Sequence, residues 1–146
     1  MTDDPGLASE YAEHMIREVP QAAALGIELV SLGPSRGAMR VPWREDLVGD
    51  PDTGVIAGGV VTTVLDHVCG LSVRSLSGDP FPTATLDLRI DYMRPAAPRS
   101  DVIAEAHCYK LTRTIAFVRA TAYDTDPDDP IATAQAAFVL HEGMGS

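Results

Sequence analysis

Cysteine, positive charge and long apolar runs are all scarce in this sequence, and each shortage excludes a class of protein. Two cysteines in 146 residues, Cys69 and Cys108, are too few for a disulfide framework, which favours a reducing compartment. Lys and Arg number 11 against 21 Asp and Glu, and the net charge of −10 argues against nucleic-acid or anionic-membrane partners, because these bind a basic face. No apolar run approaches the length that spans a bilayer.

Common catalytic and nucleotide-binding motifs are also missing. The sequence has no G-x-S-x-G elbow, no Walker-type loop and no dinucleotide fingerprint. Its four histidines have no metal-ligand spacing and neither cysteine has a C-x-x-C partner, so we expect no metal. The N-terminal stretch MTDDPGLASEYAEHM has two acids where a signal peptide carries positive charge, which predicts a cytoplasmic protein.

Two segments have the hydrophobic spacing of helices. Residues 8–18 are amphipathic, and Pro20 ends their pattern, so we expect residues 1–20 to be a helical extension. The rest of residues 1–146 fits the same single domain, since domains cluster near this size. From Gly58 to about Leu76 apolar residues recur at three and four positions, which predicts a long, largely buried helix.

Strand patterns account for most of the remaining chain. A hairpin is expected before the long helix and further strands after it, at residues 24–32, 38–43, 83–93, 101–110, 114–124 and 131–140. The segment TATLDLRIDYM (83–93) alternates strictly, which predicts a packed face with Leu86 and Tyr92 and a solvated face with Thr85 and Asp87. Because the strands are consecutive, the fold class is α+β, an antiparallel β-sheet wrapped around one long central helix.

The stretch VIAGGVVTTVLDHVCG places an acid in the middle of this apolar helix. Gly58 and Gly59 stand at its start, where the amides lack intrahelical partners and the macrodipole is positive. Such an end can bind an anion or stabilise a carbonyl oxygen that becomes negative. Asp66 follows Gly59 by two turns on the same face. A tight turn for the glycines, and an ion pair or a hydroxyl contact for Asp66, are the structural alternatives.

The distance between these groups predicts a site that needs two chains. The carboxylate of Asp66 lies about 10 Å along the helix axis from the glycine amides, too far for one small reacting group to meet both. A second copy of the helix, antiparallel across a twofold axis, would bring Asp66 of one subunit toward Gly58 of the other, which favours a homodimer. His67 lies about 100° further round the helix, and we interpret it as a core histidine.

Several segments occur together in the order of a known family: ALGIEL, a loop ending in a glycine pair, the eight-residue step from Gly58 to Asp66, and TLDLRIDYMRPA. Over positions 21–141 they resemble the hotdog-fold acyl-CoA thioesterases of the phenylacetate-pathway (PaaI-like) type. The resemblance implies hydrolysis of an acyl-CoA substrate to a free acid and CoA, with no cofactor besides the CoA of the substrate. It also implies homodimers, and leaves their pairing into homotetramers open.

The resemblance implies roles for individual residues as well. Gly58, followed by Gly59, matches the glycine whose amide polarises the thioester carbonyl. Asp66 matches the acid that serves as nucleophile or activates water. Thr85 matches a hydroxyl residue that positions the water or the carboxylate. Asp50 lies near the position where the family commonly has an asparagine that touches the carbonyl.

Two departures from the family pattern keep other functions open. Ala57 stands where the family commonly has histidine, and Asp50 would place negative charge, rather than an amide donor, near the developing oxyanion. A non-catalytic acyl-CoA binding protein is one alternative. A hydroxyacyl-thioester dehydratase on the same scaffold is the other, but that chemistry usually uses a histidine with an acid, and His67 beside Asp66 is a poor geometric match.

The phosphates of CoA require cations despite the acidic total. Arginines cluster in the second half of the sequence, and the candidates for the phosphates are Arg89, Arg94, Arg99 and Arg113. Solvated strand faces on which arginines pair with nearby acids are the structural alternative.

Overall fold

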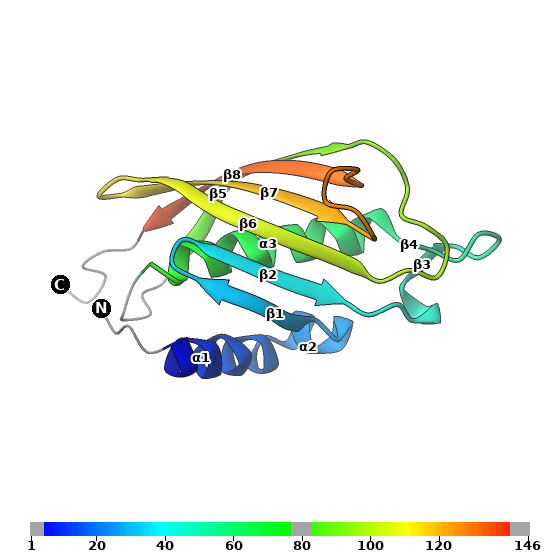
Figure 1. The fold of residues 1–146 in the computed structure, drawn as a ribbon, viewed down its shortest axis with the longest axis horizontal. Coiled ribbons are helices and arrows are strands. Elements are labelled where there is room, and N and C mark those ends of the chain that lie inside the picture. The colour runs from blue at the N-terminus through cyan, green and yellow to red at the C-terminus, as the bar shows by residue number, and fades with distance from the viewer. Residues whose placement is uncertain (1–4, 77–82, 141–146) are drawn as a thin grey trace.

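A six-stranded antiparallel sheet and one long helix form the body of the protein, as seen in a computed structural model that describes residues 5–76 and 83–140 (Figure 1). Neighbouring strands follow the order β1-β2-β6-β7-β8-β5. The strands are β1 (Glu28–Gly33), β2 (Arg36–Val41), β5 (Thr83–Tyr92), β6 (Val102–Leu111), β7 (Ile115–Tyr123) and β8 (Ala132–Leu140). The long helix is α3 (Gly58–Arg74). The predicted antiparallel sheet around one central helix is confirmed.

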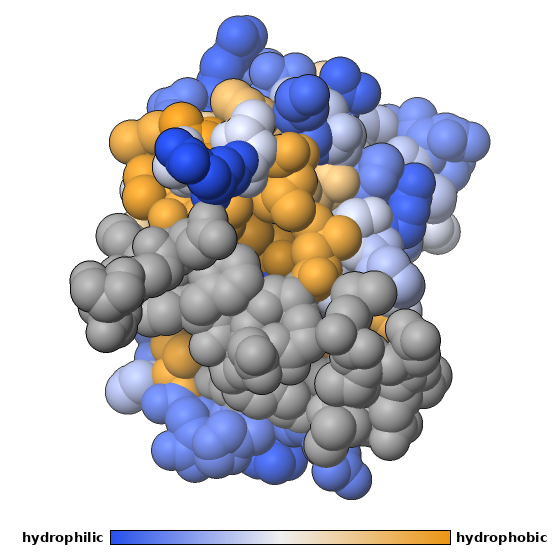
Figure 2. All heavy atoms as spheres, turned by 90° about the vertical axis from the view of Figure 1, so that its left-hand side faces the viewer, coloured by the Kyte–Doolittle hydropathy of each residue, from blue (hydrophilic) through white to orange (hydrophobic). Residues whose placement is uncertain are grey.

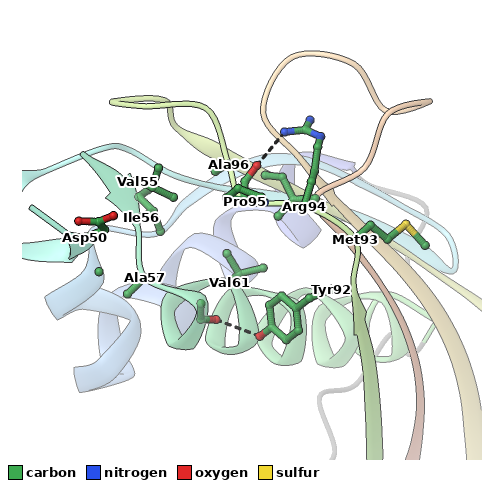
Figure 3. A pocket seen from close by; sticks show the side chains of 13 residues that line it. Asp50, Val55, Ile56, Ala57, Val61, Tyr92, Met93, Arg94, Pro95 and Ala96 are labelled. Carbon is green, nitrogen blue, oxygen red and sulfur yellow. Dashed lines mark hydrogen bonds between the residues drawn. The ribbon is translucent and has the colours of Figure 1, made fainter. Parts of the chain in front are cut away.

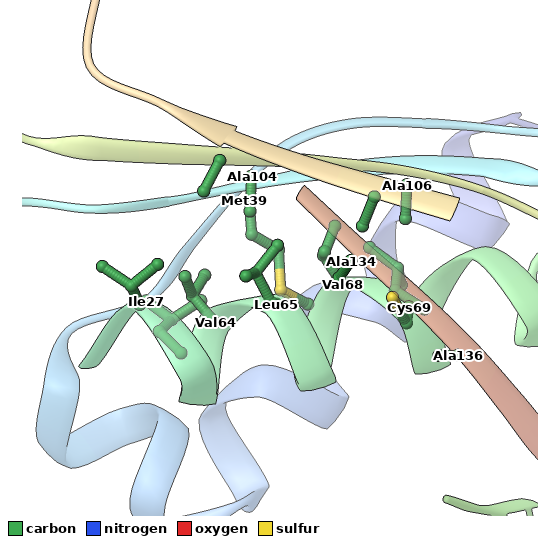
Figure 4. Packing of buried hydrophobic residues seen from close by; sticks show 14 of the residues in the cluster. Ile27, Met39, Val64, Leu65, Val68, Cys69, Ala104, Ala106, Ala134 and Ala136 are labelled. Atoms are coloured by element: carbon green, nitrogen blue, oxygen red, sulfur yellow. The ribbon is translucent and has the colours of Figure 1, made fainter. Parts of the chain in front are cut away.

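The core lies between α3 and one face of the sheet (Figure 4). The helix buries Val61, Val64, Leu65 and Val68 at the predicted spacing of three and four residues. The facing sheet positions are mostly alanines, namely Ala104, Ala106, Ala120, Ala122, Ala132, Ala134 and Ala136. Because alanine side chains are short, the large aliphatic side chains of the helix fill the space between the two layers at close packing.

One glycine of β2 is required by this packing. A Cβ at Gly37 would lie 2.9 Å from Leu71 Cδ2 of α3, closer than real Cβ contacts. The absence of a side chain at Gly37 therefore lets the strand approach the helix.

The N-terminal segment contains two helices rather than one, α1 (Pro5–Glu18) and α2 (Pro20–Leu25), and α1 packs along β1 (Figure 1). The prediction that strand structure begins at residue 24 is wrong, because α2 continues to Leu25. Pro20 ends α1 as expected but also starts α2, since the first helical position needs no amide donor. Gly26 then ends α2 with a left-handed φ of 71°.

Strand β5 lies at one edge of the sheet and contains a β-bulge that changes its predicted faces. Thr85 pairs with Phe138 and Asp87 with Ala137, so two steps along β5 correspond to one step along β8. Thr85 therefore faces α3 with Leu88 instead of facing solvent with Asp87. Leu86, predicted to be packed, is 57% exposed.

The segment before α3 carries short elements where the sequence predicted a loop. These are a 3₁₀ turn at Glu45–Leu47 and a two-stranded ribbon of β3 (Val48–Asp50) and β4 (Val55–Ile56). Figure 1 shows this ribbon beside the first turn of α3. It therefore places Asp50 next to the glycine pair.

Large exposed apolar side chains are concentrated at β5 and at one end of the sheet. Across the described ranges they are Val30, Leu86, Tyr92, Met93, Tyr109 and Leu111. Figure 2 views the left-hand side of Figure 1 and shows apolar side chains gathered on this face. Three of the six belong to β5 or directly follow it. No helix within 5–76 and 83–140 is both long and apolar enough to span a membrane.

Candidate active site

Asp66 is held in place by the strand next to its helix. It lies two turns into α3 and is partly exposed. The Thr85 hydroxyl donates a hydrogen bond to Asp66 Oδ1 at 2.8 Å. This contact depends on the β5 bulge, which turns Thr85 toward the helix. The structure thus brings together the two residues that the resemblance paired, through a feature that alternation along the strand did not predict.

The start of α3 is a second polar site. The backbone N–H groups of Val60 and Val61 donate to the Ala57 carbonyl. The amides of Gly58 and Gly59 come before them in the helix and therefore have no carbonyl acceptor within it. Both glycines are exposed, and a Cβ at Gly59 would meet nothing within 4 Å. Ligand atoms can therefore approach these amides at the positive end of the helix dipole.

Tyr92 holds this first turn from the side, and no motif in the sequence marks it as a site residue. Its hydroxyl donates to the Gly58 carbonyl oxygen at 3.0 Å and also contacts the Thr62 hydroxyl. Figure 3 shows the Tyr92 ring against the first turn of α3. The apolar alternation assigned Tyr92 to a packed face, yet the side chain is 51% exposed. The sequence signal that could have identified Tyr92 is its hydroxyl group, the one polar group on the otherwise apolar face at the end of residues 83–93.

A cavity of about 460 Å³ opens at this helix start (Figure 3). Asp50 and Gly58 both border it, together with Tyr92 and the segment that follows β5. The Asp50 carboxylate accepts the backbone N–H of Asp52 at 3.0 Å, so it also shapes the β3–β4 turn. The structure places Asp50 and Gly58 at one cavity, as the family pattern implied.

Asp66 and Thr85 border a different cavity, of about 200 Å³, on the side of α3 that faces α1 and α2. The two cavities share no lining residue. Within one chain, the acid and the helix amides therefore open into separate spaces. This arrangement agrees with the spacing argument that a single chain does not bring them to the same substrate atom.

Burial shifts the pKa values of two titratable groups near Asp66 in α3. Burial raises the pKa of the Cys69 thiol to about 12, which keeps it protonated and unreactive at neutral pH. Burial also lowers the pKa of His67, so this imidazole is neutral near pH 7. No group of three His, Cys, Asp or Glu side chains in the described part of the chain is arranged to hold a metal.

Arg94, a predicted phosphate ligand, has all five N–H donors engaged within the chain. It forms a forked pair with Asp124 at 2.8 and 3.0 Å, and reaches the carboxylate and carbonyl oxygens of Asp129 and the carbonyl of Pro95. Figure 3 shows its side chain pointing away from α3. Arg94 thus ties the segment after β5 to the β7–β8 connection.

This network predicts a measurable loss of stability when Asp124 is neutralised. The Asp124 side chain is 6% exposed, and its pair with Arg94 holds the pKa of that carboxyl far below its usual range. Asp124→Asn should lower the free energy of unfolding at pH 7 by about 2 kcal/mol, typical of hydrogen bonds to charged groups. Urea denaturation measures this difference.

The direction in which pH changes the stability contribution of Asp124 follows from its lowered pKa. A carboxyl with a depressed folded-state pKa stabilises above its unfolded pKa of about 3.9 and loses that contribution as pH falls below it. The difference between wild type and Asp124→Asn should therefore shrink at acidic pH. Asp129→Asn is the control, because the Asp129 carboxylate is 70% exposed and its pair should contribute less than about 1 kcal/mol. Equal losses in both variants would contradict this account.

The other three candidate arginines are exposed and lie apart. Arg89 is on the outer face of β5 and pairs with Asp91 at 3.4 Å. Arg113 is in the connection between β6 and β7. Arg99 donates its backbone N–H to the Gly54 carbonyl at 3.0 Å, so it stands beside the turn that follows Asp50. Arg99 is therefore connected to the ribbon at the Gly58 cavity.

Comparison with known sequences places this chain in a recognised family. Residues 53–131 match the profile of the family described as thioesterase superfamily. A Halobacterium salinarum protein named as an esterase candidate is 32% identical over 116 residues, which cover 75% of this chain and 76% of that protein. Human acyl-coenzyme A thioesterase 13 is 28% identical over 91 residues, 62% of this chain and 63% of the human protein.

Solved structures share the fold over almost the whole chain. A Pseudomonas aeruginosa protein superposes with a TM-score of 0.83 at 36% identity, covering 90% of this chain and 98% of that one. The Escherichia coli PaaI protein, from the phenylacetic acid degradation operon, has a TM-score of 0.80 at 15% identity, with 93% and 94% covered. The second similarity concerns the fold alone. Together with the family profile, these matches confirm the resemblance drawn from the sequence.

Proposed function

Because this chain belongs to the thioesterase superfamily and is a thioester hydrolase with the hotdog fold, we propose that it hydrolyses acyl-CoA thioesters to a free acid and CoA. The observation that carries the proposal is the hydrogen bond from Thr85 to Asp66, which presents a carboxylate on a helix whose start exposes the Gly58 amide. The acyl-CoA substrate is supported by the name of the human relative.

The proposed reaction uses the start and the middle of α3 in different roles. Thr85 holds Asp66 Oδ1, which directs Oδ2 to take a proton from water or to attack the thioester carbon directly. The carbonyl oxygen becomes negative in the tetrahedral intermediate and accepts the Gly58 N–H at the positive helix end. Collapse of the intermediate expels the CoA thiolate. If water attacked, the free acid is formed at once; if Asp66 attacked, a mixed anhydride is formed, which water then hydrolyses to the free acid and the carboxylate. A thiolate is a good leaving group, so no separate general acid is required.

We propose that each site combines Asp66 of one protomer with Gly58 of its partner in a homodimer. Strand β5 supports this arrangement, because it is a ten-residue edge strand with exposed Leu86 and Tyr92. An exposed apolar edge is a template for pairing with a second chain. Antiparallel pairing of two β5 strands about a twofold axis near Leu88 would continue the sheet across both protomers.

The contacts of β5 give this pairing a consequence for the site. Thr85, near the start of the strand, holds Asp66, whereas Tyr92, at its end, holds the Gly58 turn. Antiparallel β5 strands would set the start of one strand beside the end of the other. Each acid would then face the amides of the partner helix, which is the geometry that the reaction needs.

For the CoA phosphates we propose the three exposed arginines, with Arg99 first because it adjoins the ribbon at the Gly58 cavity. An exposed guanidinium can bind phosphate in a bidentate manner. Arg89 and Arg113 lie farther from that ribbon along the fold and would act in the assembled dimer. Pairing of dimers into tetramers stays a prediction from the sequence.

The direct test is release of free thiol from a panel of aliphatic and aromatic acyl-CoAs by the purified protein. Hydrolysis of at least one ester with turnover is the expected result. Binding without turnover would instead support a non-catalytic acyl-CoA binding protein, which the Asp50 carboxylate at the Gly58 cavity favours, because a negative charge there opposes an oxyanion. Calorimetry with the same esters separates binding from absence of binding.

A further inference from the structure

The cavity beside Asp66 has an apolar wall built mainly by the N-terminal helices. One side is formed by Ala12 and Ile16 of α1, Val19 between the two helices and Ala22 of α2, and the other apolar side chains are Met39, Leu71 and Phe138. Of these apolar side chains, only Leu71 lies within the 53–131 range that matches the family profile.

The polar side of the same cavity contains the candidate acid. Asp66 and Thr85 border it, with His67, Arg74 and Thr83 alongside. His67 is neutral near pH 7 because burial lowers its pKa. A group entering between α1 and α3 would thus have apolar side chains around its far end and Asp66 at its reacting end.

Gly70 gives this cavity part of its space. Glycine is the poorest helix former after proline, yet Gly70 lies inside α3, one turn after Asp66. Its φ is not in the left-handed region, so the backbone does not require glycine there. A Cβ at Gly70 would meet the Phe138 ring at 3.6 Å, an ordinary contact, in contrast to the clash at Gly37. Packing therefore tolerates alanine, and the missing methyl group leaves room in the cavity.

We infer that this cavity receives the acyl group of the substrate and that Gly70 and Ile16 set the size it accepts. The inference rests on the proposed function. An apolar cavity of about 150 Å³ holds benzene, so the volume of about 200 Å³ fits a single ring with a short linker or a short aliphatic chain. The substrate class is a short-chain or single-ring acyl-CoA. Long fatty acyl groups exceed the space.

Two variants that change the cavity in opposite directions test this inference. Gly70→Ala fills space, and Ile16→Ala opens it, whereas Glu13→Ala on the exposed side of α1 is the matched control. The assay measures kcat/KM for straight-chain esters from acetyl to palmitoyl and for single-ring esters. Thermal denaturation checks that each variant is folded.

One misplaced methylene in an apolar pocket changes discrimination by about 10- to 200-fold. Gly70→Ala should therefore lower kcat/KM at least about tenfold for the largest acyl group that the wild type accepts, and leave the acetyl ester unchanged. Ile16→Ala should raise kcat/KM about tenfold for the next longer esters. Glu13→Ala should retain the wild-type profile. A uniform change across all esters, or unchanged profiles in both cavity variants, would overturn the inference.

A separate result distinguishes failure of the proposed function from failure of the cavity inference. If the wild-type protein hydrolyses none of the esters, thioester hydrolysis is refuted, and the cavity is tested by binding. Calorimetry with non-hydrolysable thioether analogues of the same acyl series then measures the dissociation constants. The inference holds if Gly70→Ala weakens only the larger analogues and Ile16→Ala strengthens the longer ones, and it fails if affinity is independent of acyl size.

Discussion

Replacing Asp66 by asparagine is expected to reduce kcat for acyl-CoA hydrolysis by about a thousandfold or more, the range in which a positioned base or nucleophile acts. The asparagine amide has the same shape and still accepts the Thr85 hydroxyl through its oxygen, so the site should keep its structure. It can neither take a proton from water nor form an acyl intermediate. KM should change little, because the carboxylate acts on the reacting carbon rather than on CoA.

The measurement is steady-state thiol release by purified Asp66→Asn, with thermal denaturation to verify folding. Asp87→Asn is the matched control, since Asp87 is an exposed carboxylate on the other face of β5. This control should retain wild-type kcat and KM. An Asp66→Asn variant with unchanged kcat would refute the assignment of Asp66 as the acid.

Replacing Gly58 by proline is expected to lower kcat by about 10²- to 10³-fold, as for removal of one oxyanion donor. Proline removes the amide hydrogen but suits the first helical position, where its fixed φ matches the helix. Ala57 already has the extended conformation that a following proline requires, with φ −60° and ψ 141°. The substitution should therefore delete the donor without breaking α3.

The Gly58→Ala variant distinguishes two roles of Gly58: donation by its backbone N–H, and the space left by its missing side chain. Its Cβ would lie 3.9 Å from the Tyr92 ring, an ordinary contact, and the N–H is retained. If the amide acts on the thioester, the alanine variant should keep most of the wild-type kcat while the proline variant loses it. Equal losses in both variants would indicate a steric requirement at Gly58 and would contradict an oxyanion role.

The sequence predicted the main elements of the fold because each is encoded by local periodicity. Apolar residues at three and four positions in α3 and the strand patterns of β5 to β8 gave segments close to those observed. The prediction for the N-terminal region was less accurate, because a proline such as Pro20 can both end one helix and begin the next. Local patterns do not distinguish these two uses of proline.

The candidate site shows where local patterns stop being informative. Strict alternation in β5 placed Thr85 with Asp87, whereas the bulge turns Thr85 to Asp66. A bulge depends on how one strand pairs with its neighbour, so the sequence of β5 alone does not contain it. The same holds for Arg94, whose partners Asp124 and Asp129 are about thirty residues away in the chain. The spacing along α3 did predict that Asp66 and Gly58 of one chain do not reach the same substrate atom.

The most direct test of the account uses dimers that carry a different defect in each protomer. Asp66→Asn and Gly58→Pro chains with different tags are co-expressed, and the mixed dimer is isolated by both tags. If each site takes its acid from one chain and its amide from the other, one site has both wild-type groups, and the mixed dimer should recover about half of the wild-type kcat. Activity no higher than that of the two inactive parents would contradict a shared site.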